Sequence, residues 1–126
     1  MIVLDENIPE DQRQLLRGWR VRARLIGDDV GRKGMKDEQI IPLLLKLPSP
    51  TFFTRDFDFW QQSLCHREYC LVVLDLSPSE VATFVRRVLR HMLLNSKTKR
   101  LGRVVKVSQL GTEIMTAHDS PEFHAW

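Results

Sequence analysis

The stretch Cys70-Leu71-Val72-Val73-Leu74-Asp75-Leu76 is a nearly continuous apolar run that ends at Ser77-Pro78. A short run of this kind, bounded by turn residues, is typical of a strand that is buried on both faces. Helices must cover both sides of such a strand, as they do in parallel sheets. Residues 70–76 therefore predict the central strand of an α/β protein.

Further strands are expected on either side of this segment along the chain. Ile2–Leu4 and Thr51–Thr54 are rich in apolar and β-branched residues, and Trp19–Ile26 alternates between apolar and basic side chains. Val104–Val107 and Glu113–Thr116 predict a last strand and its hairpin partner.

Helical segments separate most of these strands, and we expect them at about 8–17, 37–47, 57–66 and 79–94. Gly18 is a typical stop for the first helix. Pro42 predicts a kink or a later start in the second, because proline lacks a backbone N–H. Alternating strands and helices imply a mainly parallel sheet with right-handed crossovers and helices on both faces. We expect one domain at 1–116 and a tail at 117–126.

The composition fits a globular protein. The chain has 126 residues, of which 43% are hydrophobic and 28% charged, and these proportions exclude a disordered, collagen-like or coiled-coil protein. No apolar run approaches the roughly 20 residues of a membrane span, and Asp5-Glu6 follows the first apolar residues too soon for a signal peptide. We expect a cytoplasmic protein with no membrane partner, in which Cys65 and Cys70 are free thiols.

The net charge is +3, but basic residues are concentrated in the second half of the chain. Such a block favours a polyanionic partner through counterion release. A solvated helix face next to a basic loop explains the same charges equally well. Between Val81 and Thr112 there is no acidic residue, whereas eight basic ones occur: Arg86, Arg87, Arg90, Lys97, Lys99, Arg100, Arg103 and Lys106.

Acidic residues follow two of the expected strands. Asp5-Glu6 comes directly after the first strand, Asp56 and Asp58 come just after Thr51–Thr54, and Asp37 opens the helix between them. Sites in open α/β sheets form at the carboxyl ends of strands, so these side chains are expected to converge. Carboxylates a few ångströms apart repel one another, and a divalent cation such as Mg²⁺ or Mn²⁺ relieves that repulsion. The chemistry this implies is hydrolysis of a phosphodiester.

Each acid also has a purely structural explanation. Asp37 suits the N-cap of a helix, Asp56 and Asp58 suit the cap of the turn after the strand, and Glu6 suits the solvated surface. Asp5 is harder to explain in this way, because it follows a buried strand directly. The joint pattern is therefore a stronger signal than any single acid.

Three motifs within residues 1–110 resemble the PIN-like nucleases, and more narrowly the small family of predicted nucleases from toxin–antitoxin systems. They are Leu4-Asp5-Glu6-Asn7-Ile8-Pro9, Asp37-Glu38-Gln39-Ile40 and Phe53-Thr54-Arg55-Asp56-Phe57-Asp58-Phe59. The resemblance implies a three-layer α/β/α sandwich with a central, mostly parallel sheet. It also implies a metal-dependent endoribonuclease with an acidic site of Asp5, Asp37, Asp56 and Asp58, and Glu6 as an extra ligand. An antitoxin protein and a homodimer are the partners expected besides RNA.

Roles can be assigned to these residues from the chemistry of metal-assisted hydrolysis. Asp5 and Asp56 are expected to bind the metal directly, with Asp37 and Asp58 holding metal-bound water or orienting the nucleophile. Thr54 is expected to donate a hydrogen bond to Asp56 or to a metal-bound water. Substrate phosphates are expected to meet three basic residues: Arg32, Lys33 and Arg55.

A second hypothesis keeps the same fold without catalysis. The acidic pocket then serves stability or a protein partner such as an antitoxin, whose basic residue fills the metal position. The two hypotheses differ in metal dependence, because only a nuclease should bind Mg²⁺ or Mn²⁺ through Asp5.

Overall fold

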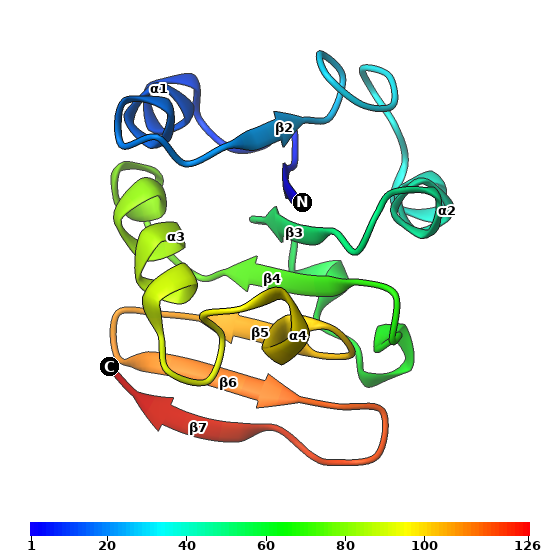
Figure 1. Cartoon of the computed structure of the whole chain (residues 1–126), viewed down its shortest axis with the longest axis vertical. Coiled ribbons are helices and arrows are strands. Elements are labelled where there is room, and N and C mark those ends of the chain that lie inside the picture. The colour runs from blue at the N-terminus through cyan, green and yellow to red at the C-terminus, as the bar shows by residue number, and fades with distance from the viewer.

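Five parallel strands form most of a seven-stranded sheet (Figure 1). The computed structural model describes residues 1–126. In it the parallel strands are β1 (Ile2–Leu4), β2 (Ala23–Leu25), β3 (Thr51–Thr54), β4 (Cys70–Leu74) and β5 (Val104–Val107). Two antiparallel strands, β6 (Gly111–Met115) and β7 (Glu122–Ala125), complete the sheet in the order β2-β1-β3-β4-β5-β6-β7. The predicted α/β class with a mostly parallel sheet is confirmed.

The strand predicted as central is the middle one of the seven, and all five residues of β4 are buried. Helices α1 (Glu10–Gly18) and α3 (Val81–Arg90) pack on one face of the sheet, where Leu16 and Val85 meet Leu4 and Phe53. Helix α2 (Asp37–Lys46) packs on the other face (Figure 1). The structure is thus a three-layer α/β/α sandwich with a core on each side of the sheet.

The first helix ends differently from the prediction. Gly18 lies inside α1, and the left-handed residue that terminates it is Arg20, whose φ is 62°. The Val21 N–H donates to Leu16 O and the Arg20 N–H donates to Arg17 O, both at 2.9 Å, which is the bonding pattern of a Schellman motif. Glycine usually occupies this position, so the chain places an arginine where it costs about 1–2 kcal/mol of backbone energy.

Helix α2 begins at Asp37 and continues through Pro42, so the predicted later start is wrong. Its N-cap is Lys36, whose N–H donates to the Gln39 side chain at 3.0 Å. The N-cap role considered for Asp37 is therefore taken by another residue, and the Asp37 carboxylate is left for other contacts.

Three other helical predictions are corrected. Two 3₁₀ turns, Phe57–Phe59 and Gln62–Leu64, replace the helix expected at 57–66. A third 3₁₀ turn, Pro78–Glu80, precedes α3, which ends at Arg90 rather than near 94. The segment after it, expected as a basic loop, contains the short helix α4 (Lys97–Arg100).

The expected tail at 117–126 is also wrong, because its last residues belong to the sheet. Strand β7 pairs with β6, and a Cβ added to Gly111 would lie 2.2 Å from His124 O, so only glycine permits this pairing. The Trp126 ring packs 5.6 Å from the Phe84 ring, and its Nε1–H donates to Ser108 O at 2.7 Å. None of the helices has the length and apolarity that crossing a bilayer requires.

Candidate functional site

The strand order reverses between β1 and β3, because the chain crosses from β1 to β2 on one side and to β3 on the other. Ligands of open α/β sheets bind outside the carboxyl ends of strands at such a point. Asp5 follows β1 here and Asp56 follows β3, so the sheet itself brings the two acidic motifs together.

Asp5 is held in place by two hydrogen bonds. Its Oδ2 accepts from the Thr54 hydroxyl at 2.7 Å, and its Oδ1 accepts from the Glu6 N–H at 2.8 Å. Burial is the largest influence on this carboxyl and raises its pKa, as does the negative charge of Asp56, whereas the two hydrogen bonds lower it. Asp5 is therefore fixed in orientation and poorly solvated, as a metal-binding carboxylate should be.

Thr54 links the two strand ends, in a way that differs from its predicted role. Its hydroxyl donates to Asp5 rather than to Asp56, and its oxygen accepts from the Asp56 N–H at 3.0 Å and from Asn7 Nδ2 at 3.3 Å. The Asn7 side-chain oxygen accepts from the Arg55 N–H at 3.2 Å. Asn7 and Thr54 together tie the loop after β1 to the loop after β3.

Asn7 is a site residue that the sequence analysis missed. Its position just before the first helix suits an N-cap, but the residue before α1 is Pro9 and no side chain caps this helix. The only signal available was its place two residues after Asp5, which by itself fits a turn as well as a site.

Three carboxylates form an acidic cluster, which we define as Asp37, Asp56 and Asp58. One oxygen from each lies within 4.8 Å of the other two. Asp56 Oδ1 accepts from the Asp58 N–H at 2.9 Å, so the cap role foreseen for Asp56 is present as well. Asp37 reaches the cluster from the first turn of α2, on the opposite side of the site from β1 and β3.

Crowding in this cluster changes the acidity of Asp37. The pKa of its carboxyl is raised from an ordinary 3.8 to about 6, and burial is the largest cause. A hydrogen bond with Asp56 and the charges of Asp56, Asp58 and Asp5 act in the same direction. The cluster therefore carries unrelieved repulsion, which a proton at low pH or a cation at higher pH would remove.

The donor set fits Mg²⁺ or Mn²⁺. Both ions prefer carboxylate oxygens, take one or two of them from a protein and keep several waters. The acidic cluster offers three such oxygens accessible to solvent, with the half-buried Asp5 carboxylate beside them.

Glu6 has a different contact from the one expected. Its Oε1 accepts from the Gly34 N–H at 2.7 Å, and Gly34 has a φ of 77°, which suits glycine. Glu6 thus anchors the loop between β2 and α2, and it is not among the three acids whose oxygens come together.

The expected phosphate-binding residues are not gathered at the acids. Lys33 Nζ lies 3.8 Å from Asp28 Oδ1, and Arg32 lines a separate hollow beside α2 with Glu38 and Lys46. Arg55 does follow β3, and its Nε is shielded from solvent without a hydrogen-bond partner. Of these three basic residues, only Arg55 lies next to the strand ends that carry the acids.

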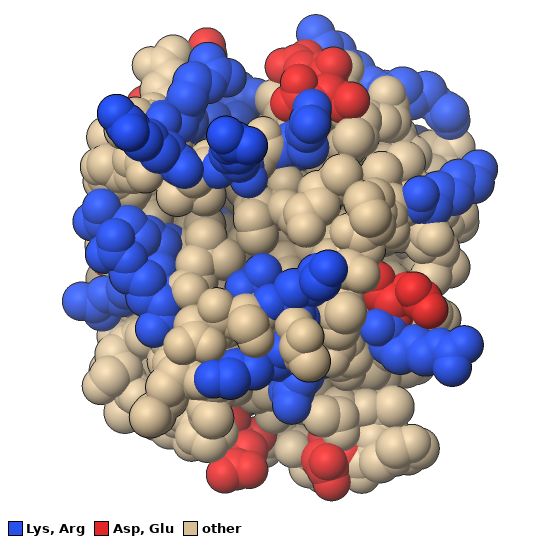
Figure 2. Space-filling model, viewed as in Figure 1, with Lys and Arg blue, Asp and Glu red and all other residues tan.

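The basic block at 86–106 is largely used within the protein, although Figure 2 shows many blue side chains over α3 and α4. The Arg86 guanidinium stacks on Trp19 at 3.8 Å, and Lys106 Nζ lies 3.4 Å from Glu113 Oε1. Arg100 is buried and donates to Thr51 Oγ1 at 2.8 Å and to Leu94 O at 2.9 Å. Much of the charge that suggested a polyanion site therefore stabilises the fold.

Comparison of the chain with protein-family models, with curated proteins and with solved structures finds no match.

Proposed function

We propose that this protein is a metal-dependent nuclease that hydrolyses RNA phosphodiester bonds. The observation that carries the proposal is the convergence of Asp5 with the acidic cluster at the point where the strand order reverses. The resemblance of the same motifs to PIN-like nucleases supports it, and suggests that the chain is the toxin of a toxin–antitoxin pair.

Mg²⁺ or Mn²⁺ held by Asp56 and Asp58 of the acidic cluster, beside Asp5, would activate water and neutralise charge on the phosphodiester. Thr54 and the Glu6 N–H orient the Asp5 carboxylate before substrate arrives. Asp37, with a pKa of about 6, loses its proton just below neutral pH and is then able to accept one from a water in the site. Arg55 follows β3 and supplies positive charge beside the acids.

The alternative is a binding module of the same fold without catalysis. The observation that favours it is the closeness of the Asp37 and Asp56 carboxylates, whose oxygens lie within 4.8 Å of each other, since a proton shared between them would relieve the repulsion without a cation. In that case a basic side chain of an antitoxin occupies the acidic cluster, and the surface is a docking site for a protein.

Cleavage of a panel of single-stranded and structured RNAs in Mn²⁺ tests the proposal. We expect cutting that a chelator abolishes and that the Asp5→Asn, Asp56→Asn double variant lacks. Asp75→Asn is the matched control, because Asp75 is an exposed carboxylate after β4 whose side chain makes no hydrogen bond or ion pair. Equal cutting by wild type and double variant, or none by either, would overturn the proposal.

A further inference from the structure

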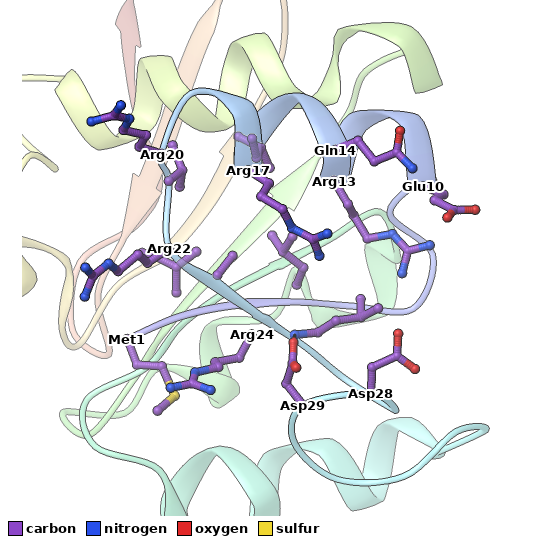
Figure 3. A pocket seen from close by; sticks show the side chains of 16 residues that line it. Met1, Glu10, Arg13, Gln14, Arg17, Arg20, Arg22, Arg24, Asp28 and Asp29 are labelled. Carbon is purple, nitrogen blue, oxygen red and sulfur yellow. Dashed lines mark hydrogen bonds between the residues drawn. The ribbon is translucent and has the colours of Figure 1, made fainter.

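A hollow of about 830 Å³ lies between α1 and β2, an edge strand of the sheet (Figure 3). We call it the arginine groove, after five arginines that line it. Arg13 and Arg17 extend from α1 toward β2 in Figure 3. The other three come from the segment around β2, at every second residue: Arg20, Arg22 and Arg24.

None of these five side chains makes a hydrogen bond or an ion pair within the protein. Arg13 Nε is shielded from solvent and has no partner. This differs from the block at 86–106, where Arg86, Arg100 and Lys106 are engaged by other residues. Five unpaired guanidinium groups around one hollow repel one another, so the groove is suited to a ligand with several negative charges.

Three acids also line the groove, but two of them are already engaged. Asp29 Oδ2 accepts from the Leu25 N–H at 2.9 Å, and Asp28 forms an ion pair with Lys33. Glu10 and Asp28 lie at one end in Figure 3, and Arg20 and Arg22 at the other. The acids therefore leave the basic end uncompensated.

The backbone conformation at Arg20 also supports a role for the groove in binding a negatively charged ligand. A left-handed conformation disfavours a side chain with a Cβ, yet the chain has arginine there rather than glycine. The Arg20 side chain lies at the basic end of the groove, where it makes no hydrogen bond or ion pair within the protein.

One end of the groove, where Glu10 and Asp28 lie, is the end nearer to the acidic site, and the basic end lies farther along β2. Ile2 and Leu4 of β1 line it, and Asp5 follows Leu4 directly. Residues two apart in an extended segment are about 6.6 Å apart, which is on the order of the separation of neighbouring phosphates along a nucleic-acid strand. Arg22 and Arg24 thus have a spacing that suits successive phosphates.

The lining also indicates how the ligand is recognised. Arginine binds phosphate with two parallel hydrogen bonds, and no aromatic residue lines the groove to stack a base. A protein partner would need exposed apolar anchors, whereas none of the seven apolar lining residues is fully exposed. Leu4 and Leu16 are buried, and the other five are half-buried: Met1, Ile2, Val21, Ala23 and Leu25. The backbone of a nucleic acid fits better than an acidic polypeptide.

We propose that the arginine groove binds the sugar–phosphate backbone of one RNA strand and guides it to the acidic site. This inference rests on the proposed nuclease function and deepens it by assigning the path of the substrate. It predicts binding that depends little on base sequence and strongly on salt.

Fluorescence anisotropy with a labelled single-stranded RNA in chelator measures binding without cleavage. We expect the Arg17→Gln, Arg24→Gln double variant to bind roughly tenfold more weakly, with a log–log salt slope lower by about 1.4, or 0.7 per lost phosphate contact. The matched control is Arg67→Gln, Arg90→Gln, which removes the same charge from exposed sites outside the groove and should change Kd less than about threefold.

Equal weakening in both double variants, with both folded by circular dichroism, would overturn the inference. Stronger displacement of the RNA by single-stranded DNA would overturn the assignment to RNA, and stronger displacement by polyglutamate would indicate an acidic protein partner instead. Failure of the nuclease proposal is distinguishable. If the groove binds RNA but no variant or wild type cuts it, only the proposed catalysis is lost.

Discussion

Two clusters of like charge adjoin β1, the acids at its carboxyl end and the arginine groove along its flank, and they are built in opposite ways. Asp5 and Asp56 both take part in hydrogen bonds with backbone or hydroxyl groups. The groove arginines have no such partners. Short carboxylates fixed in this way suit a small ion that needs defined geometry, whereas long, free guanidinium groups suit an extended polyanion.

The comparison implies that chemistry and binding reside in different residues. The largest effect is therefore expected from a variant of the acidic site that loses cleavage but keeps RNA binding. Asp56→Asn should lower cleavage more than roughly a hundredfold, because changes around metal ligands already cost about 10–100-fold. The same variant should bind RNA in chelator as well as wild type. Parallel cleavage and anisotropy measurements check this, and a loss of both together would show that the clusters are one site.

Thr54→Val sharpens the acidic side of the comparison. The change removes the hydroxyl that serves Asp5, Asp56 and Asn7, so we expect about 1–3 kcal/mol of lost stability and cleavage reduced about tenfold or more. Thr112→Val is the control, because the Thr112 hydroxyl is buried and has no hydrogen-bond partner. Urea unfolding should show that change to be neutral or stabilising. Similar losses in both variants would contradict the role given to Thr54.

The acidity of Asp37 predicts a pH dependence of stability. Because the folded protein raises its pKa from 3.8 to about 6, the folded state binds the proton more tightly than the unfolded chain does. This contribution to stability is complete below pH 3.8, is lost as pH rises to about 6, and amounts to about 1 kcal/mol after discounting for solvent.

Asp37→Asn should flatten that slope, and Mn²⁺ should raise the wild-type Tm more at pH 7 than at pH 5, since the ion needs ionised carboxylates. Thermal unfolding at both pH values, with and without Mn²⁺, measures both effects. An unchanged slope in the variant would show that another group is responsible.

Arg20→Gly tests the arginine side of the comparison and should have the smallest effect. Glycine relieves the left-handed backbone, so stability should rise by about 0.5–1 kcal/mol, while RNA binding weakens about threefold through loss of one charge. Urea unfolding and fluorescence anisotropy on the same sample test whether stability rises while RNA affinity falls. Tighter binding in this variant would contradict a role for Arg20 in the groove.

Local sequence patterns were enough to predict the central strand of the sheet. The apolar run at 70–76 predicted β4, because only a strand covered on both faces tolerates so few polar residues. The acids at 5, 37, 56 and 58 were predicted to converge from their places after strands, and the structure brings them to one edge.

Other features depended on contacts distant in sequence. The segment 117–126 looks polar and short, and it becomes β7 only because Gly111 allows close pairing and Trp126 packs on Phe84. The basic block at 86–106 suggested a ligand site from charge alone, but the Arg100 side chain is buried and donates hydrogen bonds to Thr51 and Leu94. The alternation of arginines at 20, 22 and 24 signalled a strand and gave no sign of a groove.

The sequence by itself determined the class of fold and which acidic residues follow strands. Both depend on local properties: the periodicity of apolar residues along the chain, and the position of a residue directly after a strand. Tertiary structure decided which charges remain free. Whether an arginine is paired, stacked or exposed depends on neighbours tens of residues away, as with Arg86 on Trp19 and Arg17 beside β2. Long-range packing therefore distinguishes the basic residues that support the fold from those left to meet a ligand.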